Sequence, residues 1–374
     1  MTILEYISKI RNTLQTEKEY DKYCYIFKDY IQYLEVLLKK ERANIKAVCQ
    51  LAIAYYEDRR ENEVIISLME DALAKYEDTM SKAELCEILN NLAYIYEKEL
   101  QEPEKAVKLL KRAISLDTPF INSSYALGAL CLDTDIDQAE QMFIKVLKSD
   151  PQNEEYRYHL GYCQMKKNSC EQALANFEPI SESWKDSNEL SEKAYYCCAL
   201  IMLSLGKKSE AERIANDLYL KYKLNTNSSI DVFELIDLHY ILEHYEKVVG
   251  LFEDKHYDSN GNEYGINFDK DGVQVIFYSL HVLGYDEKCK TVLESKLEDI
   301  TEIIENYRSD DALTQEEKNE SISFLENDIA AIKESYKSVI CLSTKPEISD
   351  IYQNLRLETH CYLIDCPRHY NFIK

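Results

Sequence analysis

A cluster of cysteine and histidine residues near the end of the chain is the pattern that most resembles a site of chemistry. Four residues able to bind a soft metal ion fall within ten positions: His360, Cys361, Cys366 and His369. Thiolate and imidazole groups are ligands that zinc prefers. Structural zinc sites usually draw two ligand pairs from separated stretches, whereas here one short turn would have to surround the ion. We therefore favour a packed terminal segment, and a zinc site is the alternative.

A polar stretch at 258–269 resembles a calcium-binding loop in part. Asp258, Asn260 and Asn262 have the alternate spacing of the first three ligands of an EF-hand loop. The glycine at 261 stands two positions too early for that loop. Asn260-Gly261 is also a strong turn signal for a β-hairpin. We therefore expect a protruding loop or a short β-hairpin that binds no calcium.

No arrangement typical of an enzyme is found in the sequence. There is no phosphate-binding Gly-rich loop, no Gly-x-Ser-x-Gly and no His-Glu-x-x-His, and the seven histidines are scattered. Cys197 and Cys198 are adjacent, but their strongly apolar surroundings favour core packing over a redox pair. We predict a protein that is not an enzyme, with no cofactor and no bound metal ion.

Composition indicates which elements must position any binding residues. The 374 residues include only 8 Gly and 6 Pro, too few for the many tight turns of a sandwich or an α/β barrel. Long helices with short connections remain, so we predict an all-α fold.

The net charge of -24 argues against nucleic acid or an anionic membrane as a partner. Cysteines within apolar patterns, and no apolar stretch long enough to span a membrane, favour a cytoplasmic location.

An internal repeat organises the middle of the chain. Three stretches of similar pattern begin with Leu92-Ala93, Leu127-Gly128 and Leu160-Gly161. Each is followed by a second apolar pattern with a small residue, a large residue and another apolar residue. These second patterns are Ala106, Leu110 and Ala113; Ala139, Phe143 and Val146; and Ala173, Phe177 and Ile180. Their first members are 33 and 34 residues apart, which predicts repeated helical hairpins.

This repeat resembles the tetratricopeptide repeat family, clearly over about 85–220 and in degenerate form over about 45–300. The resemblance implies a right-handed α-solenoid of helical hairpins, with small residues where two helices cross. Helical caps outside the repeat are expected at both ends. We expect an N-terminal cap at 1–45, repeats at 46–225, degenerate hairpins at 226–308 with a turn-rich insertion at 256–270, and a C-terminal cap with an irregular tail at 309–374.

The resemblance also implies where a partner binds, because the first helix of each unit lines the concave face in this family. Tyrosine recurs at those positions, and it combines a rigid apolar ring with a polar tip. The expected partner-binding residues are Tyr56, Asn90, Asn91, Tyr94, Tyr125, Tyr158, His159, Tyr162, Tyr196, Tyr240 and Tyr278. Some relatives clamp a C-terminal carboxylate with Lys, Asn and Arg, but only Asn91 fits that clamp. A basic or aromatic protein or peptide therefore suits this face better.

These observations together predict a non-enzymatic scaffold that binds a protein or peptide on the concave face of a helical-repeat superhelix. One alternative is a regulatory switch that responds to a bound peptide by changing its shape. Another is an immunity or inhibitor protein that neutralises a basic toxin or enzyme, which the acidic charge would favour by electrostatic steering. The sequence does not name the partner and does not define the oligomeric state.

Overall fold

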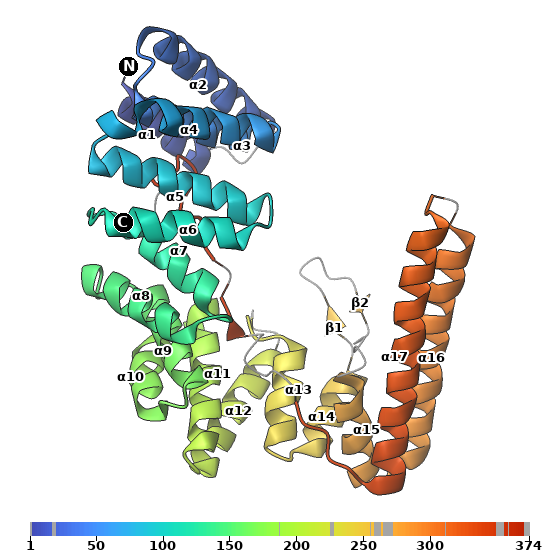
Figure 1. Ribbon diagram of the computed structural model, residues 1–374. Helices are drawn as coiled ribbons and strands as arrows, with labels where there is room; N and C mark the ends of the chain where they lie inside the picture. Colours follow the sequence, from blue (N-terminus) through green and yellow to red (C-terminus); the bar gives the residue numbers. More distant parts are fainter. Residues whose placement is uncertain are drawn as a thin grey trace. The chain divides into compact units, whose positions relative to one another are not determined.

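The structure is a computed structural model in which antiparallel helical hairpins follow one another along the chain (Figure 1). It describes residues 2–16, 20–186, 188–224, 228–254, 256–257, 263–264, 272–310, 312–348, 355–357 and 359–369. The chain forms two compact units. Unit 1 comprises Met1–Asn176 and Leu357–Lys374, and unit 2 comprises Phe177–Arg356.

Unit 1 is built from paired helices joined by short turns. Its elements are α1 (Ile3–Thr16), α2 (Tyr20–Lys40), α3 (Ile45–Glu57), α4 (Asn62–Tyr76), the 3-10 turn Glu77–Thr79, α5 (Lys82–Lys98), α6 (Pro103–Ser115), α7 (Asn122–Cys131), α8 (Ile136–Ser149), α9 (Glu154–Lys166) and the first part of α10 (Cys170–Ser181). The first helices of its hairpins are α3, α5, α7 and α9. The predicted all-α fold of repeated tetratricopeptide-like hairpins is confirmed.

The repeat residues pack where the sequence pattern predicts. The small and large residues of α6, α8 and α10, such as Ala106, Ala139 and Phe143, are fully buried. Gly128 in α7 shows why a small residue is required there. A Cβ atom added to it would lie 3.1 Å from the Phe143 ring. Helices α7 and α8 therefore cross so closely that even a methyl group would crowd the ring.

Local signals begin several helices. Ser81 and Glu84 form a capping box at the start of α5, in which each side chain hydrogen-bonds the backbone of the other residue. Asn44 caps α3 by accepting a hydrogen bond from the Ala47 backbone. Thr314 and Glu317 form a second capping box, which opens the last long helix.

Unit 2 continues the helical hairpins with less regular lengths. Its elements are the rest of α10, the 3-10 turn Trp184–Asp186, α11 (Glu189–Ser204), α12 (Lys208–Lys223), α13 (Val232–Ile241), α14 (Tyr245–Glu253), β1 (His256–Tyr257), β2 (Glu263–Tyr264), α15 (Gly272–Val282), α16 (Asp286–Ser309) and α17 (Gln315–Leu342). Helices α16 and α17 form a long hairpin (Figure 1). Among the described residues, no helix is both long and apolar enough to cross a membrane.

The insertion between α14 and α15 contains a short antiparallel β-pair. His256 lies opposite Tyr264, and Tyr257 lies opposite Glu263. This pairing agrees with the β-hairpin expected there. The expected turn at Asn260-Gly261 and the calcium-like pattern lie outside the described residues.

The four expected segments do not coincide with the two units. The division between units falls inside α10, and the end of the chain returns to unit 1. The expected division of the chain therefore stays a prediction, with segments at 1–45, 46–225, 226–308 and 309–374. The return of the last residues to unit 1 matters most, because it places them against the first helices of the hairpins.

Candidate functional site

An extended segment near the end of the chain, residues 359–369, lies against α3, α5 and α7 of unit 1 (Figure 1). We call these residues the tail, and the helix surface that contacts them the tail-binding surface. Asn90 and Asn122 each donate a hydrogen bond to the carbonyl of Tyr362, at 2.8 and 3.1 Å. The backbone N–H of Ile364 donates to Asn91 Oδ1 at 2.8 Å. Three asparagines thus bind the backbone of the tail.

The asparagine side chains are held in place by their own neighbours. Asn90 and Asn91 are fully buried on α5. Ser123 on α7 donates to Asn90 Oδ1 at 2.9 Å, and Asn90 Nδ2 lies 3.2 Å from Asn91 Oδ1. An amide side chain offers both donors and an acceptor. Adjacent asparagines can therefore bind a carbonyl and an N–H of an extended peptide at the same time.

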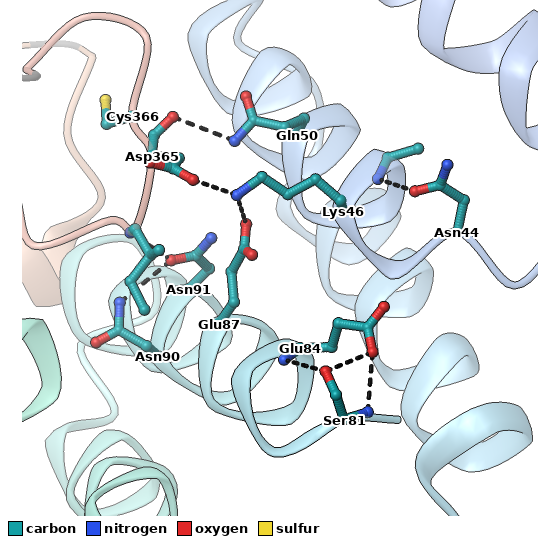
Figure 2. A network of polar contacts seen from close by, with 12 residues as sticks. Asn44, Lys46, Gln50, Ser81, Glu84, Glu87, Asn90, Asn91, Asp365 and Cys366 are labelled. Atoms are coloured by element: carbon teal, nitrogen blue, oxygen red, sulfur yellow. Dashed lines mark hydrogen bonds and ion pairs between the residues drawn. The ribbon is translucent and has the colours of Figure 1, made fainter. Parts of the chain in front are cut away.

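A charged network binds the turn that follows (Figure 2). Lys46 on α3 forms ion pairs with Asp365 of the tail and, at 2.7 Å, with Glu87 on α5. Gln50 donates to the Asp365 carbonyl at 3.1 Å and accepts from Tyr30 at 3.0 Å. Burial raises the pKa of the Glu87 carboxyl to about 7, although Lys46 opposes this. Two acidic groups, one from the tail, therefore share a single half-buried ammonium.

A second polar contact lies at the start of the tail. The backbone N–H of His360 donates to the Tyr125 hydroxyl at 3.1 Å. The ring Nδ1 of His360 lies 2.7 Å from Glu155 Oε2. Tyr125 also donates to Glu155, and His159 lies 3.7 Å from the same carboxylate. Burial opposes ionisation of Glu155, but contacts from His159, His360 and Tyr125 outweigh it and lower the pKa to about 2. Glu155 is therefore an ionised acceptor for the tail.

The side chains of the tail enter two different environments. Tyr362 is fully buried, packs edge-to-face on Tyr94 with ring centres 5.0 Å apart, and donates to Glu97 at 2.7 Å. Ile364 is buried against Cys86, Leu89 and Ala113, where α5 meets α6. The tail-binding surface thus has an aromatic site with a polar acceptor and a separate apolar site.

Most of the predicted binding residues of unit 1 line or adjoin this surface. Asn90, Asn91, Tyr94 and Tyr125 contact the tail directly, and Tyr56 packs edge-to-face on Tyr94 at 5.7 Å. The remaining three are buried and contribute to packing on α9: Tyr158, His159 and Tyr162. His159 is stacked on the Phe143 ring with centres 4.7 Å apart.

Solved structures similar to the chain include tetratricopeptide repeat proteins. YrrB, described as a TPR protein with an unusual peptide-binding site, is 13% identical, with a TM-score of 0.44 over 57% of this chain and 97% of that chain. A tetratricopeptide repeat protein from Parabacteroides merdae is 16% identical, with a TM-score of 0.43 over 86% of this chain and 98% of that chain. PilF of Pseudomonas aeruginosa is 16% identical, with a TM-score of 0.41 over 57% and 91%. No family model and no curated protein matches.

The predicted residues of unit 2 are found in two places. Tyr196 is fully buried and donates to the Glu234 carbonyl at 3.0 Å. Tyr240 and Tyr278 pack edge-to-face with centres 6.0 Å apart. Tyr240 also donates to the Pro346 carbonyl at 2.8 Å. The stretch after α17 therefore lies against first helices of unit 2, much as the tail does in unit 1.

Several residues of the tail-binding surface were not predicted as binding residues. They are Lys46, Gln50, Glu87, Glu97, Asn122 and Glu155. Helical spacing offers one signal for them. Glu87 precedes Asn91 by four residues, and Asn122 precedes Tyr125 by three, so each lies on the same helix face as a predicted residue. Helical spacing does not identify the ligand, however, because nothing in the local pattern says that residues near the end of the chain would bind this surface.

The Cys/His cluster separates into two parts. His360 contacts Glu155, as described above. Cys361, Cys366 and His369 instead lie together, with their potential ligand atoms all within 4.8 Å of one another. The four residues therefore do not converge as one set, and three of them remain able to bind a metal ion.

Proposed function

We propose that unit 1 is a peptide-binding scaffold, and that the tail occupies the peptide-binding surface as a ligand supplied by the chain itself. The observation that carries this proposal is the set of hydrogen bonds with the tail backbone, in which Asn90 and Asn122 donate and Asn91 accepts. Contacts to backbone atoms do not depend on the side chains of the ligand. The same surface is therefore suited to an extended peptide from another protein.

The tail indicates which peptide would bind well. An aromatic residue at the place of Tyr362 reaches Glu97, and an acidic residue at the place of Asp365 reaches Lys46. Basic groups at the two ends meet carboxylates: His360 contacts Glu155, and Arg368 lies 3.4 Å from Glu57. These complementary pairs support the aromatic ligand expected from sequence. They also indicate that the peptide carries one acidic residue between two basic residues.

Because the tail occupies the peptide-binding surface, a regulatory switch is favoured over a scaffold whose surface is permanently open. A peptide from another protein must compete with the tail, whose local concentration is set by its covalent attachment. Binding in trans would then release the end of the chain. We propose this displacement as the switching step, in place of a change in the pitch of the whole superhelix.

The first experiment measures binding of a fluorescent peptide with the sequence of residues 359–369 under reducing conditions. The full-length chain should bind it weakly, because its own tail competes. A full-length Tyr362→Ala/Ile364→Ala variant should bind it at least about 10-fold more tightly, because the competing tail is weakened. Fluorescence anisotropy gives both affinities, and circular dichroism verifies that the variant is folded.

The control keeps the weakened tail and changes the surface. Adding Asn90→Ala and Asn91→Ala to that variant should abolish the gained binding, since the backbone hydrogen bonds are lost. A peptide carrying the Tyr362→Ala and Ile364→Ala changes should bind weakly to every chain. Equal peptide binding by the folded variants with and without Asn90 and Asn91 would reject the proposed site.

A further inference from the structure

Three potential metal ligands meet where the tail turns. Cys366 Sγ lies 3.6 Å from His369 Nδ1, and the Cys361 sulfur completes a group whose ligand atoms are all within 4.8 Å of one another. Zinc binds thiolate sulfur at about 2.3 Å and imidazole nitrogen at about 2.0–2.1 Å, so adjacent ligand atoms of a tetrahedral site are separated by about 3.5–3.8 Å. The cluster needs only small side-chain movements to reach that geometry.

The fold, not the local sequence, brings these ligands together. Asp365 adopts a left-handed backbone conformation with φ 57°, which reverses the chain between Cys361 and Cys366. Lys46 holds the Asp365 carboxylate, and Arg11 donates to the Cys366 carbonyl at 3.2 Å. The turn is therefore fixed by residues of α1 and α3, and its ligands are ordered before any ion binds.

The cluster lies in a largely enclosed place. Cys366 is buried, with 3% of its surface exposed. The thiolate form of cysteine is the one that binds metal ions. Two thiolates also neutralise the charge of a divalent ion, which reduces the cost of holding it in a largely buried place.

We propose that Cys361, Cys366 and His369 bind one zinc ion. A set of two thiolates and one imidazole selects zinc over magnesium or calcium, which prefer oxygen ligands. Three protein ligands leave a fourth coordination position for water or for a ligand from outside the chain. The ion joins both ends of the stretch that carries Tyr362 and Ile364, so it holds the tail in the shape that fits the surface. The site itself does not depend on the function proposed above.

The test uses the full-length chain, reduced, stripped of metal with a chelator and returned to metal-free buffer. Zinc is titrated in competition with a chromophoric chelator, and cobalt is added to a second sample. We expect one zinc ion per chain at this site, and a cobalt spectrum with thiolate charge-transfer bands and tetrahedral d–d bands. Cys361→Ser and His369→Ala should each weaken zinc binding by more than about 100-fold, since even changes beyond the direct ligands cost 10–100-fold.

The matched control is Cys341→Ser, which removes an exposed cysteine of α17. It should leave the stoichiometry, the affinity and the cobalt spectrum unchanged. Circular dichroism of the metal-free variants verifies folding, so a loss of zinc binding is not mistaken for unfolding. In the unmodified chain, zinc should also protect Cys361 and Cys366 from alkylation, as read by mass spectrometry.

Three results would each overturn the proposal. They are no uptake of zinc by the reduced chain, uptake that the Cys361→Ser and His369→Ala variants retain in full, and a cobalt spectrum without thiolate bands. A failure of the peptide experiment would leave these measurements untouched, because they read the metal directly. Zinc uptake with no peptide binding would therefore reject the proposed function and keep the metal site.

Discussion

At the scale of single residues, the buried amides of α5 carry the contact with the tail. Asn90 donates to the Tyr362 carbonyl and accepts from Ser123, so it links the tail to α7. Removing one partner of a buried hydrogen bond leaves the other without its bond, which costs about 1–3 kcal/mol. This is a larger effect than the usual surface substitution produces.

We expect Asn90→Ala to lower the free energy of unfolding of unit 1 by about 1–3 kcal/mol. Denaturant unfolding followed by circular dichroism measures the change. Asn306→Ala is the matched control, because Asn306 is exposed on α16, and it should change stability by less than about 0.5 kcal/mol. Equal effects of the two substitutions would show that the amide contact contributes nothing measurable.

A pH effect is expected at Glu155. Its pKa is about 2 in the folded chain, below the ordinary value of 4.5, since contacts from His159, His360 and Tyr125 outweigh the effect of burial. A lowered carboxyl pKa stabilises the folded state above pH 4.5, and this contribution disappears as the pH falls toward 2. The shift corresponds to at most about 3 kcal/mol.

The measurement compares the unmodified chain with Glu155→Gln across this pH range. The difference in free energy of unfolding should be largest above pH 4.5 and should shrink between pH 4.5 and 2, because glutamine does not ionise. A difference that stays constant over that range would mean that Glu155 is not an ionised partner of the tail.

At the scale of elements, two glycines in helices have opposite environments. A Cβ atom on Gly128 would meet Phe143 at 3.1 Å and Met142 at 3.2 Å, where α7 crosses α8. Gly250 in α14 has no atom within 4 Å of such a Cβ atom and has no positive φ. The same residue type is therefore required by packing at one position and only lowers helix propensity at the other.

We expect Gly128→Leu to destabilise unit 1 by about 1–3 kcal/mol, since the added side chain overpacks the crossing. Gly250→Ala should instead stabilise unit 2 by about 0.5–1 kcal/mol, because alanine favours the helix. Thermal unfolding of the two variants checks the signs. A stabilising Gly128→Leu would show that α7 and α8 have room that the packing does not indicate.

At the scale of the whole molecule, the end of the chain completes the core of unit 1. Tyr362, Leu363, Ile364 and Cys366 are all buried there, although they follow unit 2 in sequence. Their burial removes apolar surface of α5 and α7 from water. Unit 1 therefore depends on residues that are far away along the chain.

A chain that ends at Arg356 should consequently lose protection in unit 1 and keep it in the long hairpin of unit 2. Hydrogen–deuterium exchange should become faster in α5 and α7, while α16 and α17 keep their rates. The melting temperature alone would not distinguish a local loss of stability from a global one. The exchange rates of the individual peptides make that distinction. Unchanged exchange in α5 and α7 would mean that the tail adds no stability to them.

What the residues alone determine is local and repeated. The 33- and 34-residue spacing of Ala106, Ala139 and Ala173 predicts the hairpins, because small residues must recur wherever helices cross. The capping residues Thr314 and Glu317 predict the start of α17 in the same way, through contacts within one turn. The resemblance to the tetratricopeptide repeat, which rests on this period, placed Asn90, Asn91 and Tyr125 on the first helices as expected partner-binding residues.

The tertiary structure alone decided what those residues contact. Lys46 meets Asp365 across 319 positions of sequence, and Asn90 meets Tyr362 across 272. No local pattern encodes such a pairing, because it depends on where folding brings the end of the chain. The same holds for Cys361, Cys366 and His369. Their spacing by itself favoured an incidental cluster, and the left-handed turn at Asp365, held by Lys46, places their ligand atoms together.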